Sequence, residues 1–245
     1  MLARSLLFNI GFYGVTSLLA VLLFPALLLP RHVFLRTVRL WAWAVDGLLV
    51  NVIGASIEVR GAERLQGPCL VACKHQSAWE TIALNRIIPD PCFVLKRELT
   101  WIPFFGWYLL KTGQVAVNRS AGSRALKAML NDAKEAVESG RQLVIFPEGT
   151  RVAPGESRPY HTGVVALYRH LEVPVVPVAV NSGLTWGRRA FLKRPRKVIL
   201  SVLEPIPPGL DRSAFMSRLQ TVIEGETRSL EAEALSSERD RPGAP

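Results

Sequence analysis

The stretch 5–30 contains no charged residue over 26 consecutive positions, and this feature limits the folds open to the chain more than any other. About 20 apolar residues are enough to cross the hydrocarbon core of a bilayer. A secretory signal would have a shorter apolar region followed by a small-residue cleavage site, and the segment 22–32 offers none. We therefore predict that this stretch lies in a membrane rather than in the core of a soluble domain.

A second apolar stretch, 40–57, is interrupted by Asp46 and Asn51, and three arginines lie between the two stretches. If both stretches crossed the bilayer, this basic loop would lie on the side opposite the rest of the chain. That arrangement opposes the preference of Lys and Arg for the cytoplasmic side if the rest of the chain is cytoplasmic. We predict that residues 1–56 form a membrane-associated segment, a helix pair that dips into one leaflet rather than spanning it.

Short, apolar, β-branched runs alternate with helical patterns along the rest of the chain. The runs are typical of strands, and they occur at 57–60, 69–73, 92–95, 114–117, 142–146, 175–180 and 198–202. The clearest helical pattern is 123–139, where an apolar stripe is followed by Gly140. The alternation predicts an α/β domain with helices packed on a sheet. We place this domain at 57–235, with a C-terminal helix or helix pair at 210–235 and a disordered polar tail at 236–245.

The chain is strongly basic, with a formal net charge of +10 and a pI of about 10.1. Such an excess favours anionic partners, including membrane surfaces. Between 185 and 201 there is no acidic residue, and the basic side chains there are Arg188, Arg189, Lys193, Arg194, Arg196 and Lys197. This segment is either a solvated face or a contact for lipid headgroups or an acidic carrier protein. Since no nucleic-acid-binding motif is present, we expect no nucleic-acid partner.

The three cysteines, Cys69, Cys73 and Cys92, are odd in number, and two of them lie in one apolar run. Free cysteines are among the most buried residues. A zinc site would require more ligands at better spacing. We therefore predict buried free thiols and no metal site.

The segment 74–80 (KHQSAWE) directly follows the predicted strand 69–73. A histidine at the end of a strand stands at the rim of an α/β sheet, where ligand sites are common. Glu80 can approach His75 if His75 lies just before a helix and Glu80 in its second turn. A carboxylate on one imidazole nitrogen fixes the tautomer and stabilises the imidazolium, which gives a general base for a hydroxyl nucleophile. Ser77 is the nearby candidate for a covalent nucleophile, but its flanks do not form a G-x-S-x-G elbow.

The segment 146–151 (FPEGTR) follows the predicted strand 142–146. Proline ends the strand and glycine permits a tight turn, which leaves Glu148, Thr150 and Arg151 together on a loop. The planar guanidinium of Arg151 suits a phosphate, and Glu148 and Thr150 can hydrogen-bond a hydroxylated substrate. The segment 113–119 likewise ends in Arg119, so that two arginines at two strand ends could bind one phosphate.

The run 173–180 (VPVVPVAV) is an apolar strand with prolines at 174 and 177. Proline cannot donate to a strand ladder, which excludes regular central pairing near the start of this run. Pro174 and Pro177 are therefore expected either to shape the wall of an apolar pocket or to mark an edge strand.

Taken in order, His75-x4-Glu80, the segment 113–119, FPEGTR and the segment 173–177 resemble the four motifs of the glycerolipid acyltransferase family, and most closely its bacterial 1-acyl-sn-glycerol-3-phosphate acyltransferases. The match covers about 57–202. FPEGTR combined with an upstream H-x4-acid is specific, whereas either motif alone is weak. The first motif usually ends in Asp, and this chain has Glu80. The second carries Asn118 where an acid is common, so only Arg119 is carried over from it.

The resemblance implies a mixed, largely parallel sheet flanked by helices. It also implies transfer of a fatty acyl group from acyl-CoA or acyl-carrier protein to the sn-2 hydroxyl of 1-acylglycerol 3-phosphate. His75, oriented by Glu80, would be the base, and residues after His75 would donate backbone hydrogen bonds to the oxyanion. Arg119, Arg151 and Lys96 would hold the phosphate, with Glu148, Gly149 and Thr150 beside it. No cofactor is implied, and the implied location is the cytoplasmic face of a bacterial inner membrane.

Two other functions stay open from the sequence. One is a related acyltransferase with a different acceptor, such as glycerol 3-phosphate or a lyso-aminolipid. The other is an inactive, membrane-anchored scaffold, which only the replacement of Asp by Glu80 favours. The motifs leave the donor thioester and the acyl-chain length undetermined.

Overall fold

The computed structural model describes residues 1–118 and 122–239. The described helices are α1 (Leu2–Leu22), α2 (Arg31–Leu48), α3 (Trp79–Ile87), α4 (Phe105–Lys111), α5 (Gly122–Glu138), α6 (Gly163–Leu171) and α7 (Arg212–Arg239). The strands are β1 (Ser56–Arg60), β2 (Leu70–Cys73), β3 (Pro91–Lys96), β4 (Val115–Val117), β5 (Gln142–Ile145), β6 (Val175–Val180) and β7 (Lys197–Val202). Short helical turns complete the described chain: η1 (Phe24–Leu28), η2 (Leu49–Ile53), η3 (Ala62–Arg64), η4 (Arg97–Trp101) and η6 (Ser182–Leu184).

The described strands form one sheet in the order β1-β7-β6-β2-β5-β3-β4. Neighbouring strands are parallel except β6 and β7, which are antiparallel, so β1 and β7 run against the other five. The predicted α/β fold with a mixed, largely parallel sheet is confirmed. Each predicted strand is present, with its ends moved by no more than one residue.

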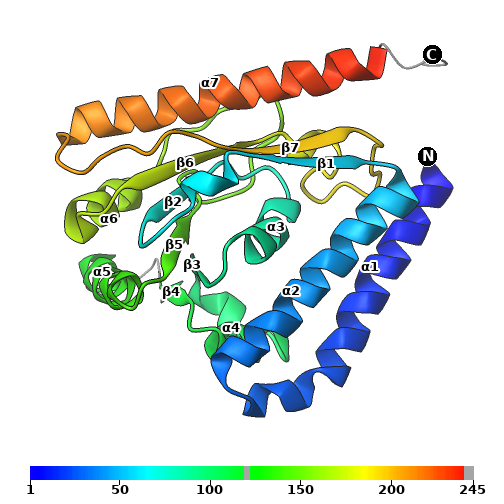
Figure 1. The fold of residues 1–245 in the computed structure, drawn as a ribbon, viewed down its shortest axis with the longest axis horizontal. Helices are drawn as coiled ribbons and strands as arrows, with labels where there is room; N and C mark the ends of the chain where they lie inside the picture. Colours follow the sequence, from blue (N-terminus) through cyan, green and yellow to red (C-terminus); the bar gives the residue numbers. More distant parts are fainter. Residues whose placement is uncertain (119–121, 240–245) are drawn as a thin grey trace.

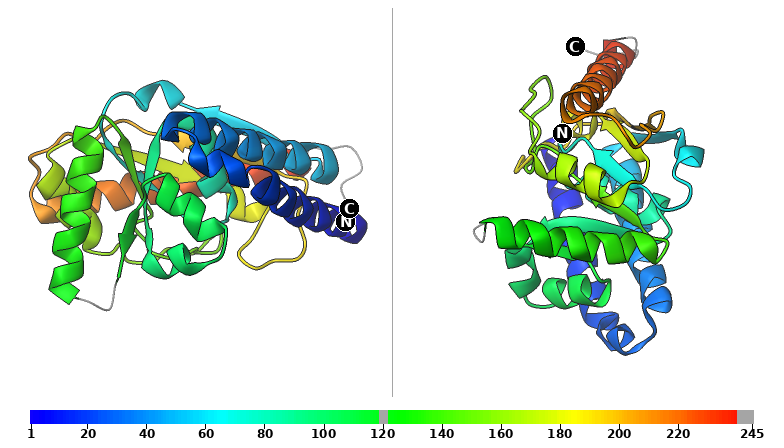
Figure 2. Two further views of the ribbon diagram at one scale, coloured as in Figure 1. Left: turned by 90° about the horizontal axis from the view of Figure 1, so that it is seen from below. Right: turned by 90° about the vertical axis from the view of Figure 1, so that its left-hand side faces the viewer.

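The two faces of the sheet pack against different helices, because successive side chains of a strand point to opposite faces. In β2, Val71 and Cys73 join the cluster that contains residues of α1, α2 and α3. Leu70 and Ala72 join the cluster that contains residues of α5, α6 and α7. Figures 1 and 2 show α7 on one side of the sheet and the α1–α2 pair on the other.

Helices α1 and α2 run antiparallel beside each other, with η1 as the turn between them (Figure 1). By length and composition, α1 is the one described helix that could cross a membrane. Its large apolar side chains are mostly exposed, whereas α2 is held against the domain. Asp46 of α2 accepts a hydrogen bond from Trp79 Nε1 at 2.8 Å and pairs with Arg86 Nε at 2.9 Å, which joins α2 to α3.

The C-terminal helix is longer than predicted. A single helix, α7, continues to Arg239, so the residues 236–239 assigned to a disordered tail are helical. The hydroxyls of Ser236 and Ser237 bond to the carbonyl of Glu233 and support this last part of the helix. The rest of the expected tail, 240–245, lies outside the described residues.

The expectation of an edge strand at 173–180 is wrong, since β6 lies in the interior of the sheet between β7 and β2. Proline is tolerated there because the ladder between β6 and β7 includes only residues 178–180 of β6. Pro177 comes directly before the first residue of β6 that pairs with β7, so its missing N–H interrupts no hydrogen bond of the β6–β7 ladder.

Candidate functional site

The catalytic candidates lie where β2 ends and α3 begins. Residues 74–78 form the connecting loop, and its hydrogen bonds hold His75 on both sides. The N–H of His75 donates to Glu148 Oε2 at 3.0 Å, and the carbonyl of His75 accepts from Val152 N at 2.8 Å. The loop after β5 thus braces the loop after β2, as expected when two neighbouring parallel strands end at the same edge of a sheet.

The carboxylate of Glu80 is the centre of this loop. Its Oε1 lies 2.8 Å from His75 Nδ1 and accepts hydrogen bonds from the backbone N–H groups of Gln76 and Ser77 at 2.7 Å each. Its Oε2 accepts from the hydroxyl of Ser182 at 2.6 Å. The side chain is completely buried. Glu80 lies in the first turn of α3, and its length allows it to reach back across the loop to the histidine.

The same contacts correct the expected oxyanion donors. The backbone N–H groups of Gln76 and Ser77 already donate to Glu80, so they are not directed at a substrate. Ser77 Oγ accepts from the N–H of Trp79 at 2.9 Å, which gives Ser77 a structural contact at the start of α3. A nucleophilic role for Ser77 gains no support from this arrangement.

His75 opens onto a cavity of about 1240 Å³. Its ring stacks on Phe146, with the ring centroids 4.0 Å apart and the planes inclined by 20°. Because Glu80 binds Nδ1 and a carboxylate can only accept, the proton belongs on Nδ1, and Nε2 is the basic nitrogen. The His75–Glu80 pair therefore has the arrangement of an oriented general base at a cavity wall.

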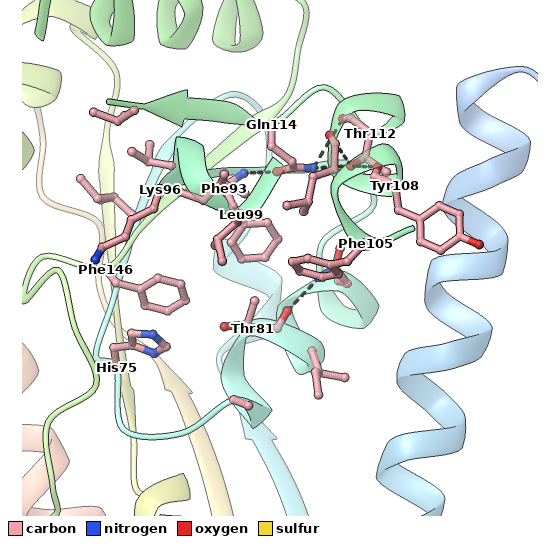
Figure 3. Close-up of a pocket in the computed structure, with 18 of the residues that line it drawn as sticks. His75, Thr81, Phe93, Lys96, Leu99, Phe105, Tyr108, Thr112, Gln114 and Phe146 are labelled. Carbon is pink, nitrogen blue, oxygen red and sulfur yellow. Dashed lines mark hydrogen bonds between the residues drawn. The ribbon is translucent and has the colours of Figure 1, made fainter. Parts of the chain in front are cut away.

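Apolar side chains make up most of the cavity wall. Residues of α1, α2, α3, β3, α4 and α5 contribute to it, and Figure 3 shows His75 and Lys96 on one side with Tyr108 and Thr112 opposite. A large apolar space beside a general base is suited to an acyl chain.

Cationic side chains lie at the His75 end of the cavity. Lys96, at the end of β3, and Arg151, after β5, both line it. Arg188 also lines it and donates to the carbonyl of Arg151 at 3.3 Å. Thr150 and Gly149 belong to the same wall, and Gly149 adopts a φ of 62°, a left-handed conformation that favours glycine. Of the predicted phosphate ligands, Arg119 lies outside the described residues.

Glu148 does not face the cavity as predicted. Its side chain is fully buried, and Oε1 lies 2.7 Å from Lys74 Nζ while Oε2 accepts from the N–H of His75. Both oxygens are thus engaged within the protein. Burial raises the pKa of the Glu148 carboxyl, and the neighbouring Lys74 ammonium opposes that shift. The geometry gives Glu148 a part in holding the loop of His75 and not in contacting substrate.

The expected acyl-pocket residues also lie elsewhere. Pro174 is exposed directly before β6, and Pro177 is buried within the sheet beside Ala72 of β2. Neither residue lines the cavity. The cavity is lined instead by residues of several helices, of β3 and of the loops after β2 and β5. The composition of the strand 173–180 therefore could not reveal it.

Several residues at the site were not singled out from the sequence. Arg188 was recognised only as part of a basic segment, and Ser182, which binds Glu80, had no motif around it. Lys74 and Gln76 flank His75, and both contact acidic residues of α7. Their position next to His75 was the only sign in the sequence that they belong to the site. Their partners lie 150 and 155 residues further along the chain, so the contacts could not be predicted from a local pattern.

The cysteines are free and buried, as predicted. Burial raises the pKa of the Cys69 thiol to about 12 and also raises the pKa values of Cys73 and Cys92. These thiols remain protonated and are poor nucleophiles. Within residues 1–118 and 122–239, no group of three or more His, Cys, Asp or Glu side chains could hold a metal ion.

Comparisons with known proteins agree with this geometry. The family model described as "Acyltransferase" matches residues 56–181, just over half of the chain. A Pseudomonas aeruginosa protein named 1-acyl-sn-glycerol-3-phosphate acyltransferase is 37% identical over 70% of this chain and 68% of its own length. The human 1-acyl-sn-glycerol-3-phosphate acyltransferase beta is 31% identical over 63% of this chain and 57% of its own length.

Among solved structures, the crystal structure of the 1-acyl-sn-glycerophosphate (LPA) acyltransferase PlsC from Thermotoga maritima superposes with a TM-score of 0.78. That comparison covers 95% of this chain and 98% of the other at 22% identity, and it establishes the shared fold. The family match and the 37% identical relative show that the chain is an acyl-transferring enzyme. The chain belongs to the acyltransferase family.

Proposed function

We propose that this protein transfers a fatty acyl group from acyl-CoA or acyl-carrier protein to the sn-2 hydroxyl of 1-acylglycerol 3-phosphate, which gives phosphatidic acid. The observation that carries the proposal is the His75–Glu80 pair at one end of an apolar cavity, beside Lys96, Arg151 and Arg188. The names of the relatives support the choice of acceptor. The acceptor has one hydroxyl to deprotonate, one phosphate for the cationic side chains and one acyl chain for the apolar space.

The proposed reaction is a direct transfer. His75 Nε2 accepts the proton of the sn-2 hydroxyl as its oxygen attacks the carbonyl carbon of the thioester. The buried Glu80 carboxylate stabilises the imidazolium through Nδ1. When the C–S bond breaks, the imidazolium returns the proton to the thiolate sulfur. The products are the ester and the free thiol, and no cofactor is consumed.

The cationic side chains give the acceptor its orientation. Arg151 offers a planar set of donors suited to a phosphate, and Lys96 adds a second positive charge at the same end of the cavity. With the phosphate held at this end, the glycerol backbone would lie beside His75 and the acyl chain would extend along the apolar wall. Positioning of this kind is a large part of catalysis of a two-substrate reaction.

The location we propose is a membrane surface, with α1 embedded in one leaflet. Leu6, Ile10 and Leu18 of α1 are about half exposed or more, and the cavity is lined by other residues of the same helix. Both the acceptor and the product are lipids, so an opening beside an embedded helix would spare them transfer through water. The cytoplasmic face of a bacterial inner membrane, where acyl thioesters are made, is part of this proposal.

The test is acyl transfer by purified, detergent-solubilised protein. Labelled oleoyl-CoA or acyl-carrier protein is supplied with 1-acylglycerol 3-phosphate, and the product lipid is separated and counted. His75→Ala should lose essentially all turnover. His170→Ala is the matched control, because His170 is exposed near the end of α6 and does not line the cavity. Equal loss in both variants, or full activity of His75→Ala, would count against the mechanism.

A panel of acceptors tests the substrate separately. Glycerol 3-phosphate and a lyso-aminolipid are compared with 1-acylglycerol 3-phosphate at equal concentration. We expect a clear preference for the acceptor that carries both the phosphate and one acyl chain. Turnover of the lyso-aminolipid alone would refute the acceptor but leave the acyltransferase chemistry intact, whereas inactivity with every acceptor and donor would favour the scaffold.

A further inference from the structure

Two buried acidic residues of α7 reach the loop that carries His75. Glu224 and Glu231 are seven residues apart, which is about two helical turns, so they share one face of the helix. This face is turned toward the sheet, since Ile223 and Leu230, which directly precede the two glutamates, are also buried. Figure 1 shows α7 lying along the sheet on the side away from α1 and α2.

Glu224 holds Lys74, the residue before His75. Lys74 Nζ is 2.9 Å from both carboxylate oxygens of Glu224 and 2.7 Å from Glu148 Oε1. The hydroxyl of Tyr160 donates to Glu224 Oε1 at 2.9 Å. The Lys74 side chain is fully buried, so this ion cluster is shielded from solvent. Glu148 continues the connection, because its other oxygen accepts from the N–H of His75.

Glu231 holds Gln76, the residue after His75. The amide Nε2 of Gln76 donates to Glu231 Oε1 at 2.7 Å, and the amide Oε1 accepts from the N–H of Gly183 at 3.1 Å. Glu231 Oε2 accepts from the N–H of Gly155 at 3.1 Å. The connection thus joins α7 to the His75 loop, to the loop after β5 and to η6, beside the Ser182 that binds Glu80.

The burial of so many charges needs an explanation other than stability. The attraction within a buried ion pair often does not offset the free energy lost when its members leave water, and an apolar face of α7 would pack on the sheet without that loss. Fully satisfied buried polar networks do fix one arrangement of the groups they connect. Here the groups that are fixed are the two chain neighbours of the catalytic base.

We propose that Glu224 and Glu231 are positioning residues for His75, so that α7 determines where the imidazole lies in the cavity. This inference rests on the proposed acyl transfer with His75 as its base. Neither residue lines the cavity, so neither is expected to contact substrate. A displacement of about 1 Å at a catalytic group can cost about 10²-fold in rate, which is the scale of effect expected from releasing the loop.

The experiment compares Glu224→Gln and Glu231→Gln with Glu226→Gln in the full-length protein. Glu226 is half-buried on the same helix and takes no part in either cluster, so its variant is the matched control. We expect kcat to fall about 10- to 100-fold in the two test variants, with the KM values for donor and acceptor changed less than about twofold. The control should keep the kcat of the wild type.

A swap separates positioning from a general loss of structure. In Gln76→Glu/Glu231→Gln, the new glutamate can accept from Gly183 N and from the new glutamine, which in turn accepts from Gly155 N. All three hydrogen bonds of the original pair are thereby available again. We expect the swap to recover most of the kcat lost in Glu231→Gln, while Gln76→Glu alone, with two carboxylates facing each other, should be strongly impaired.

Three results would overturn the inference. The first is a kcat within twofold of the wild type in both single variants. The second is a loss of activity that is fully accounted for by a loss of folded protein at the assay temperature. The third is a swap variant that folds but does not recover kcat. The folded fraction is measured by circular dichroism in the same detergent. Inactivity of the wild type would instead count against the proposed function, so the two failures are distinct.

Discussion

At the scale of single residues, one buried carboxylate connects the candidate base to the backbone of its loop. Glu80 stands where the family motif usually has aspartate, and its carboxylate contacts His75 and two backbone N–H groups from the first turn of α3. The acid at this position therefore orients the base and also closes the loop. The motif could be found from the sequence. That Glu80 also closes the loop could not, because this depends on hydrogen bonds within the folded loop.

Glu80→Gln should lower kcat by about 10²- to 10⁴-fold, the usual contribution of general base catalysis. The amide keeps the shape of the side chain but removes the negative charge that stabilises the imidazolium. Steady-state acyl transfer at saturating substrates provides the measurement. Ser182→Ala is the control, because it removes one hydrogen bond to Glu80 Oε2 and leaves the contact with His75 in place. Equal kcat in wild type and Glu80→Gln would contradict the role of the carboxylate.

Arg151→Met should raise KM for 1-acylglycerol 3-phosphate about 10- to 100-fold and leave KM for the thioester donor nearly unchanged. A hydrogen bond to a charged group contributes about 1.5–3 kcal/mol, and each 1.4 kcal/mol corresponds to a factor of ten. Initial rates with each substrate varied in turn provide the two KM values. Arg169→Met, which alters an exposed arginine of α6, should change neither. An equal rise in both KM values would argue against a specific phosphate contact.

At the scale of elements, the helices at the two ends of the chain have different tasks. Helix α7 is amphipathic in the ordinary sense, with a buried face against the sheet, yet that face contains the acids that bind Lys74 and Gln76. Helix α1 leaves many of its apolar side chains exposed, as a helix does when its surroundings are lipid. The sequence predicted both helices, because apolar periodicity and the uncharged run are local features.

Ile10→Glu/Leu18→Glu should lower the fraction of protein bound to anionic phospholipid vesicles by at least about tenfold. A charged residue in the bilayer interior costs about 2.5–3.5 kcal/mol, with less at the interface. Both residues are exposed on α1, so the fold should tolerate the changes. Vesicle flotation measures the bound fraction, and Leu235→Glu on α7 is the control at an exposed leucine elsewhere. Unchanged flotation of the double variant would remove α1 from the proposed membrane contact.

At the scale of the whole molecule, the cavity is assembled from segments that are far apart in the chain. Helices α1, α2, α4 and α5, strand β3 and the loops after β2 and β5 all contribute side chains to it. Its apolar wall thus joins the N-terminal helix pair to the α/β domain that the sequence separated at residue 57. An acyl chain bound there would contact both parts at once.

Leu99→Trp should shift donor or acceptor preference toward shorter acyl chains. Leu99 lies in the middle of the cavity wall in Figure 3, and an indole there would displace the end of a long chain. Each methylene that loses its contact costs about 0.8 kcal/mol, or about fourfold in kcat/KM. The ratio of kcat/KM for dodecanoyl and oleoyl substrates is the measurement. Leu99→Met conserves volume and, as the control, should leave this ratio as in the wild type. If Leu99→Trp also left the ratio as in the wild type, the acyl chain would have to bind elsewhere.

The sequence alone determined the strands, the N-terminal and C-terminal helical segments, the helix at 123–139, the His75–Glu80 pair and the cationic Arg151, because each depends on a local pattern of apolar spacing, turn residues or motif. Helices α4 and α6 were not predicted and came only from the structure. The tertiary structure alone decided that Glu148 binds Lys74 rather than substrate, that Pro177 lies inside the sheet, and that Glu224 and Glu231 hold the neighbours of His75. These are contacts between residues many positions apart. Their geometry follows from which strands become neighbours and which helix covers which face, and no local pattern encodes that choice.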